Sequence, residues 1–150
     1  RSLRAERARR VARRVGLTVL DAGIVIAVLD GDDTHHRAAR DALRGALTRG
    51  DRLVVPASAY AEAMVGPSRR GEAASATLDA FVDALPAVVE PATREIVRSA
   101  AALRAQHGRS LRLSDALVIA TADVLGADVV LTTDTGWPDT SVLVSIVGRT

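Results

Sequence analysis

The sequence contains no cysteine and no lysine. The absence of cysteine excludes disulfides and thiolate-bound zinc. The absence of lysine excludes a Walker-type phosphate loop and any enzyme that needs a lysine Schiff base. All 20 basic side chains are arginines, and only three histidines are present. Imidazole general-base catalysis is therefore not expected, and we look for chemistry among the carboxylates and arginines.

Aromatic residues are also scarce, since Tyr60, Phe81 and Trp137 are the only three. With 48% hydrophobic residues, the core has to be built from Ala, Val, Leu and Ile. Short Val/Ile/Leu strands alternate with longer Ala/Leu helices, which predicts a single α/β domain with a mostly parallel sheet covered on both faces. No long uncharged apolar run or secretory segment is visible, so we expect neither membrane insertion nor export, and a cytoplasmic location.

The pattern of apolar residues predicts a series of elements. The expected strands are 18–20, 53–55, 87–90, 128–131 and 142–147, and the expected helices are 23–29, 34–49, 57–65, 72–84, 92–107 and 114–125. Thr34, Ser58 and Ser114 are the predicted helix N-caps. The predicted C-terminal caps are the glycines that follow helical segments: Gly50, Gly66, Gly108 and Gly126.

Charge divides the chain into two parts. Residues 1–16 hold seven arginines and one glutamate, a net charge of +6, whereas the remainder holds 13 arginines against 17 acids, a net charge of −4. We therefore expect a basic N-terminal arm at 1–16 and one folded domain at 17–150. The arm could form an amphipathic helix that contacts nucleic acid or a partner, or it could be a frayed tail, and both readings stay open.

Four acids occupy similar places in this pattern: Asp21, Glu62, Asp115 and Asp134. Asp21 and Asp134 follow predicted strands, whereas Glu62 and Asp115 lie near predicted helix starts. Ligands of open parallel sheets bind beyond the carboxyl ends of the strands, so we expect all four acids to face one crevice there. Taken singly, each acid also fits an ordinary turn, helix-start or surface position.

Four carboxylates placed close together would repel one another and raise their pKa values unless a cation compensated them. Oxygen-only ligation suits Mg²⁺ or Mn²⁺. A divalent ion held in this way can activate water and stabilise charge on a phosphodiester. The pattern therefore predicts metal-dependent phosphodiester hydrolysis.

The order of these acids resembles that of the PIN-domain ribonucleases, particularly the VapC-type toxins of bacterial toxin-antitoxin pairs. The resemblance spans about residues 17–148 and rests on Val19-Leu20-Asp21, Ala61-Glu62, Ser114-Asp115-Ala116-Leu117 and Leu131-Thr132-Thr133-Asp134. It implies a three-layer α/β/α fold, Mg²⁺- or Mn²⁺-dependent RNA cleavage, a homodimer, and inhibition by a cognate antitoxin protein. Asp21, Glu62, Asp115 and Asp134 match the acidic positions of the family and are the expected metal ligands and catalytic residues.

The chain departs from the family pattern in two places. The family commonly has Ser or Thr one or two positions after the first acid, where this chain has Ala22 and Gly23. Many members also carry an acid or amide soon after the fourth acid, where this chain has Trp137, with Asp139 beyond it as a further candidate ligand. Both departures bear on the strength of metal binding.

Arginine forks bind phosphates and stack on unpaired bases, which makes arginines near the expected pocket candidates for RNA binding. The candidates are Arg112, Arg109, Arg69 and Arg70, with Arg112 the strongest because it lies three residues from Asp115.

The main alternative is a PIN-like module that binds RNA or protein without cutting. A phosphotransfer domain of the receiver or aspartate-phosphatase type is disfavoured by the lack of lysine. A dinucleotide enzyme is disfavoured because no glycine-rich turn follows the first predicted strand.

Overall fold

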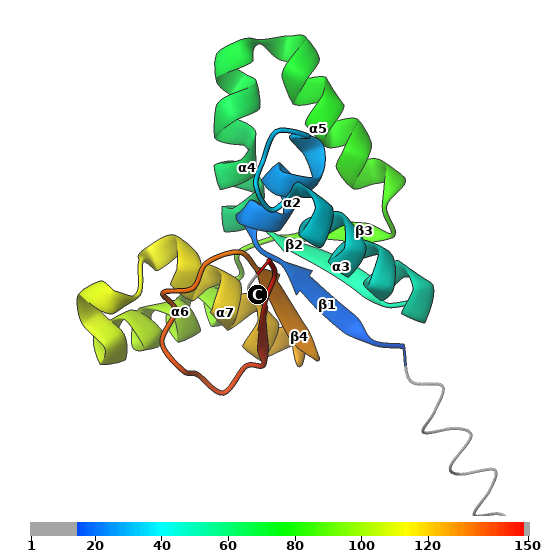
Figure 1. The fold of residues 1–150 in the computed structure, drawn as a ribbon. Helices are drawn as coiled ribbons and strands as arrows, with labels where there is room; N and C mark the ends of the chain where they lie inside the picture. The colour runs from blue at the N-terminus through cyan, green and yellow to red at the C-terminus, as the bar shows by residue number, and fades with distance from the viewer. Residues whose placement is uncertain (1–14, 149–150) are drawn as a thin grey trace, which may run out of the picture.

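A computed structural model of the protein describes residues 15–148 and contains a five-stranded sheet at its centre (Figure 1). The strands are β1 (Leu17–Leu20), β2 (Arg52–Pro56), β3 (Ala87–Glu90), β4 (Val129–Thr132) and β5 (Val144–Ile146). Their order across the sheet is β3-β2-β1-β4-β5, and every neighbouring pair is parallel. The predicted α/β class is confirmed, and the sheet is parallel throughout.

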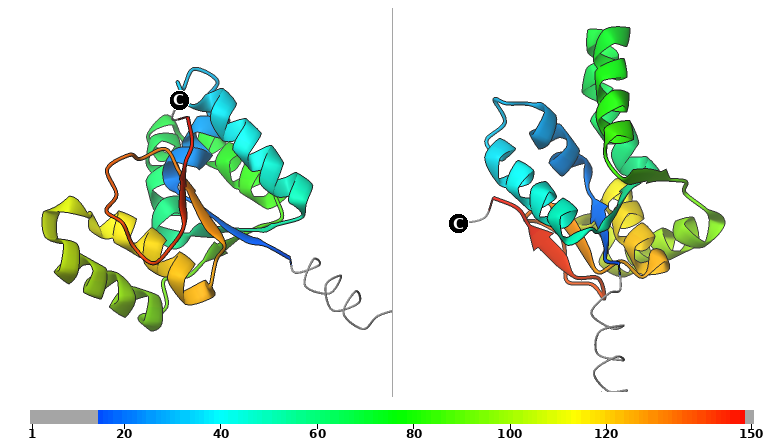
Figure 2. Two further views of the ribbon diagram at one scale, coloured as in Figure 1. Left: turned by 60° about the horizontal axis from the view of Figure 1, so that its bottom comes forward. Right: turned by 90° about the vertical axis from the view of Figure 1, so that its right-hand side faces the viewer.

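Helices connect and cover the strands. They are α2 (Ala22–Leu29), α3 (His36–Arg49), α4 (Ala57–Arg70), α5 (Glu72–Ala84), α6 (Arg94–His107), the short 3₁₀ helix η1 (Gly108–Ser110) and α7 (Leu113–Leu125). Helices α2 and α3 lie on one side of the sheet and α6 and α7 on the other, which gives the predicted three layers (Figure 2). Helices α4 and α5 form a hairpin that extends away from the rest of the domain (Figure 1).

The core consists of aliphatic side chains, as the composition predicts. Val19, Leu20, Leu53 and Val130 of the central strands are almost completely buried, and burying an aliphatic side chain of this size stabilises a fold by roughly 1.5–3 kcal/mol. β-branched residues suit strands that are covered on both faces.

A buried polar cluster lies at the amino-terminal ends of the strands. The Thr18 hydroxyl donates to the Asp51 carboxylate at 3.0 Å, and Arg49 pairs with the same carboxylate at 3.0 Å. Both partners contact the same Asp51 oxygen, Oδ2, and they explain Asp51 as a structural residue.

At the carboxyl ends of the strands, the strand order creates a crevice. The chain proceeds from β1 outward to β2 and β3, and then returns to β4 on the other side of β1. In such sheets, ligands bind where the order reverses, beyond the carboxyl ends of the strands. Here that position lies between β1 and β4, which are the strands that Asp21 and Asp134 follow.

The predicted serine caps are wrong. Helix α4 begins at Ala57 with Pro56 at the N-cap position, and α7 begins at Leu113 with Arg112 there. The Ser58 hydroxyl instead donates to the carbonyl of Ser114 at 3.5 Å and so joins the first turns of α4 and α7. Asp115 is consequently the third helical residue of α7, not the first.

The predicted cap at Thr34 is also wrong. His35 occupies the N-cap position of α3. The turn before α3 is closed by the Asp33 carboxylate, which accepts a hydrogen bond from the His35 amide at 2.7 Å.

The predicted end of α4 at Gly66 is wrong as well. The helix continues through Pro67 to Arg70 and is followed by Gly71. Pro67 is buried, so its packing offsets the hydrogen bond that a proline removes from a helix. The other three glycine caps are confirmed, because Gly50, Gly108 and Gly126 directly follow their helices with φ values of 75°, 58° and 64°.

The remaining boundaries agree with the prediction to within two residues, and helix α5 and strand β3 agree at both ends. Most of the basic arm predicted at 1–16 lies outside the described residues. Within residues 15–148, none of the helices has the length and apolar character that crossing a bilayer requires.

Candidate functional site

Asp21 lies directly after β1 and caps the N-terminus of α2, as expected for a strand-end carboxylate. One carboxylate oxygen accepts from the amide of Ala22 at 2.8 Å, and the other accepts from the Thr132 hydroxyl at 2.7 Å. The residue is only 5% exposed. Burial first, and then the nearby carboxylates of Asp115 and Glu62, raise the pKa of Asp21 from 3.8 to about 6 against the lowering effect of these hydrogen bonds.

Thr132, the last residue of β4, connects the first acid to the fourth. Its hydroxyl donates to Asp21 and accepts a hydrogen bond from the Asp134 amide at 3.0 Å. The Asp134 carboxylate in turn accepts from the Gly136 amide at 2.7 Å, which orients it at the start of the loop. Asp134 is more accessible than Asp21, with a side chain that is 34% exposed.

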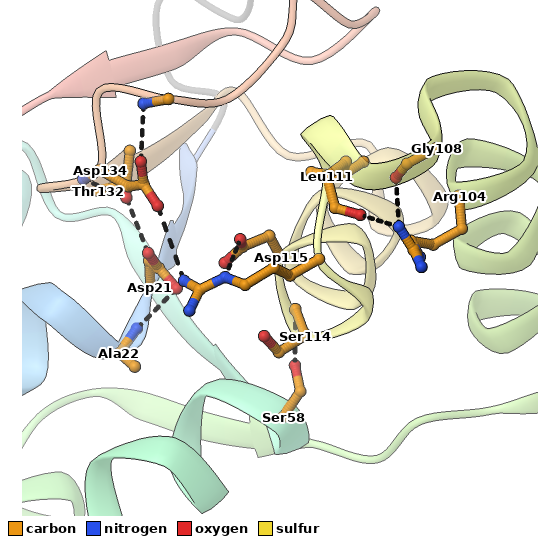
Figure 3. Close-up of polar contacts among 12 residues, drawn as sticks. Asp21, Ala22, Ser58, Arg104, Gly108, Leu111, Ser114, Asp115, Thr132 and Asp134 are labelled. Atoms are coloured by element: carbon orange, nitrogen blue, oxygen red, sulfur yellow. Dashed lines mark hydrogen bonds and ion pairs between the residues drawn. The ribbon is translucent and has the colours of Figure 1, made fainter.

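Asp115 reaches the same region from the first turn of α7. Its side chain is 6% exposed, and one oxygen accepts from Nε of Arg112 at 3.1 Å. A second guanidinium nitrogen of Arg112 lies 3.8 Å from an Asp134 oxygen. Asp21, Asp115 and Asp134 thus come from three separate elements and face a common space (Figure 3).

Glu62 lies one turn into α4 and is half-buried. It raises the pKa values of both Asp21 and Arg112, so its charge acts on the same space. Glu62 also lines a cavity of about 380 Å³ between α2 and α4, together with Ile26, Leu29, Asp30 and Arg70. Of the four acids, Glu62 alone lines this cavity.

Asp21, Asp115 and Asp134 are joined through Thr132 and Arg112, whereas Glu62 acts on Asp21 and Arg112 through its charge. Among residues 15–148, no three His, Cys, Asp or Glu side chains stand close enough together to hold a metal ion as they are placed here. The donor set itself fits a hard divalent cation, because it consists of carboxylate oxygens, two of them on buried side chains. One guanidinium offsets only part of the negative charge of four carboxylates.

The other predicted residues are distributed more widely. Asp139 is exposed in the loop after β4, and the contacts that join Asp21, Asp115 and Asp134 do not include it. Arg109 is exposed in η1, and Arg69 lines a shallow pocket beside Tyr60 and Met64. Of the four arginines, Arg112 contacts the acids and Arg70 shares the cavity of Glu62.

Two threonines of the site were not singled out from the sequence. Thr132 supplies a hydroxyl to Asp21, and Thr133 lies against Gly23, where a Cβ atom would clash with the Thr133 hydroxyl oxygen. Hydroxyls from the end of β4 therefore border the first acid, where Ala22 and Gly23 provide none. The Thr132-Thr133 pair directly before Asp134 was the available signal.

A parallel sheet between helices, with acids beyond the strands that flank its reversal point, defines an α/β domain whose carboxylates lie at the carboxyl ends of its central strands. The PIN domain family matches residues 18–143, and the chain belongs to this family.

Solved structures share the fold at low sequence identity. A VapC20 toxin of Mycobacterium tuberculosis, described as cleaving the sarcin-ricin loop, is 18% identical with a TM-score of 0.64, covering 75% of this chain and 86% of its own. A toxin-antitoxin complex from Klebsiella pneumoniae is 21% identical with a TM-score of 0.64, and the match covers 79% of this chain and 87% of that one. VapBC2 of Rickettsia felis, solved bound to a promoter DNA fragment, is 14% identical with a TM-score of 0.69, covering 86% and 97%. No curated protein matches the chain by sequence.

Proposed function

We propose that this protein is an endoribonuclease that requires Mg²⁺ or Mn²⁺, with Asp21, Glu62, Asp115 and Asp134 as the residues that hold the ion. The observation that carries the proposal is the buried, hydrogen-bonded carboxylate of Asp21, whose pKa the acids around it help to raise to about 6. A cluster of this kind is costly unless a cation compensates it. PIN-domain membership supports the same chemistry.

When bound, the metal would supply an activated water and stabilise charge on the phosphodiester. The protein's own contribution is to hold the carboxylates in place. The Ala22 amide and the Thr132 hydroxyl fix both oxygens of Asp21, and the Gly136 amide fixes Asp134. Asp115 is anchored in the first turn of α7, where the helix dipole favours a negative charge.

The exposed arginines beside this crevice are the proposed contacts to the RNA backbone. Arg112 lies at the acids themselves and Arg70 lines the adjoining cavity, whereas Arg109 and Arg69 lie farther out. Guanidinium forks bind phosphate oxygens in pairs, so these side chains would hold the strand across the carboxylates.

We further propose that the protein is the toxin of a toxin-antitoxin pair, located in the cytoplasm, and that it works as a homodimer restrained by an antitoxin protein. The support is the shared fold of the solved toxins and toxin-antitoxin complexes, several of which cover most of this chain. An antitoxin segment bound in the cavity beside Glu62 would contact one of the four acids.

The test is cleavage of a structured RNA by purified protein with Mn²⁺ or Mg²⁺. We expect the wild type to cut, and we expect Asp21→Asn and Asp115→Asn to lose at least about 100-fold in rate, because each removes a charged ligand. Asp41→Asn is the matched control, since Asp41 is exposed on α3. Equal rates in all four proteins would refute the assignment.

The alternative is a PIN-like module that binds RNA without cutting it. The observation that favours it is the pairing of Arg112 with Asp115 and Asp134, which neutralises part of the cluster without a metal. Calorimetry with Mn²⁺ separates the two functions. A nuclease site takes up the ion, whereas a binding module would retain RNA on a filter without metal uptake or cleavage.

A further inference from the structure

Arg112 is placed unusually for a surface arginine. Its side chain is 69% exposed, yet it reaches Asp115, which is 6% exposed, and comes within 3.8 Å of Asp134. The pKa of Arg112 is raised, first by the hydrogen bond to Asp115 and then by the charges of Asp115, Glu62 and Asp134. A positive charge from the solvent side therefore lies against several acids of the crevice.

The backbone just before Arg112 is held in place by hydrogen bonds and packing. Arg104 of α6 donates to the carbonyl oxygens of Gly108 and Leu111, the latter at 2.6 Å, and the Leu111 side chain is fully buried. Arg112 follows at the N-cap position of α7. The backbone at Arg112 is therefore fixed, whereas its side chain is exposed. The guanidinium can move away from the acids without disturbing the core.

A carboxylate oxygen that accepts from a guanidinium directs a lone pair at it, and a metal ligand must direct a lone pair at the ion. The guanidinium and a divalent ion also compete for the same negative charge. The geometry points to Arg112 as an internal cation that competes with the divalent ion for Asp115 and Asp134. The inference rests on the proposed metal site and concerns how its occupancy is controlled.

Two consequences follow from this competition. Metal uptake requires Arg112 to move away, so the wild-type site binds the ion more weakly than its carboxylates alone would allow. A displaced guanidinium then stands at the rim of the crevice, where a backbone phosphate can pair with it. Arg112 therefore links the occupancy of the metal site to the approach of RNA.

The experiment is calorimetric titration with Mn²⁺ of wild-type protein, Arg112→Gln and Arg109→Gln. The Arg109 variant is the matched control, because it removes the same charge from an exposed position three residues away that does not contact the acids. We expect Arg112→Gln to bind Mn²⁺ roughly 3- to 10-fold more tightly than Arg109→Gln, in line with the loss of one partly exposed ion pair. Arg112→Lys, which keeps the charge but not the fork, should stay within about twofold to threefold of wild type.

The outcomes separate this inference from the proposed function. Tighter binding by Arg112→Gln alone supports the competition. If wild type binds Mn²⁺ and Arg112→Gln binds it equally or more weakly than Arg109→Gln, the competition is refuted and the metal site stands. If none of the proteins takes up Mn²⁺ at millimolar concentration, the metal site itself is refuted, and the inference falls with it.

Discussion

At the scale of single residues, Asp21 is a carboxyl group whose burial disfavours its charged form. Its neighbours supply two hydrogen bonds, yet burial still raises its pKa to about 6. Because the folded protein favours the protonated form, this group stabilises the fold most below pH about 4, and that contribution is lost as the pH rises through about 6. At neutral pH, the charged side chain costs stability that a bound cation would recover.

Asp21→Asn is therefore expected to stabilise the protein at pH 7 in the presence of a chelator. A shift from 3.8 to about 6 corresponds to at most about 3 kcal/mol, and we expect roughly 1–2 kcal/mol after the hydrogen bonds readjust. Urea unfolding at pH 7 and at pH 4 measures the effect. The advantage of the variant should shrink at pH 4, where wild-type Asp21 is protonated in the folded state. An Asn variant that is less stable at pH 7 would show that the charge of Asp21 is already compensated within the protein.

The sequence was informative about where the four acids lie and less informative about what surrounds them. Asp21 and Asp134 emerge at strand ends because an apolar strand stops at a charge, and such breaks are visible in sequence. The bond from Thr132 to Asp21 spans 111 positions and depends on β4 pairing beside β1. The contacts of Arg112 depend on a side-chain conformation. Neither could be predicted from local pattern.

At the scale of elements, the first turn of α2 packs closely against the end of β4. Gly23 leaves room for Thr133, whose hydroxyl oxygen occupies the place that a Cβ atom on Gly23 would need. Alanine in the first turn would improve helix propensity by up to about 1 kcal/mol, but overpacking costs about 1–3 kcal/mol. The contact with Thr133 therefore decides whether a substitution at Gly23 stabilises or destabilises the protein.

A double-mutant cycle tests this contact. We expect Gly23→Ala to destabilise the wild type by about 1 kcal/mol and to stabilise the Thr133→Ala background by a few tenths to about 1 kcal/mol, because the steric conflict is then absent. Chemical denaturation of the four proteins gives the coupling energy. The same effect of Gly23→Ala in both backgrounds would mean that α2 and the end of β4 do not constrain each other.

Helix boundaries show where local signals failed. Ser58 and Ser114 have the side chains of N-caps, but the Ser58 hydroxyl bridges α4 and α7, and each helix starts before its serine. A glycine followed by a proline, as at Gly66 and Pro67, usually marks the end of a helix. Here the buried proline packs against the domain, and α4 continues to Arg70. In these cases, tertiary contacts outweighed propensities of about 1–3 kcal/mol.

At the scale of the whole molecule, the parallel sheet brings distant residues together. Strand order β3-β2-β1-β4-β5 places the ends of β1 and β4 side by side, and α4 and α7 meet at their first turns. The fold class follows from the alternation of strands and helices, which sequence reveals well. The strand order follows from long-range pairing, and this order brings Asp21 and Asp134 together at the ends of β1 and β4.

The proposed function requires a divalent ion to bind among Asp21, Glu62, Asp115 and Asp134. The most direct measurement is a crystal structure of the protein grown with Mn²⁺, with the ion located by its anomalous scattering. We predict a peak bonded to oxygens of Asp21 and Asp115, with Glu62 or Asp134 coordinating directly or through water, and with the Arg112 guanidinium withdrawn from Asp115. A structure at saturating Mn²⁺ that shows no peak among these side chains, with Arg112 still paired to Asp115, would contradict the account.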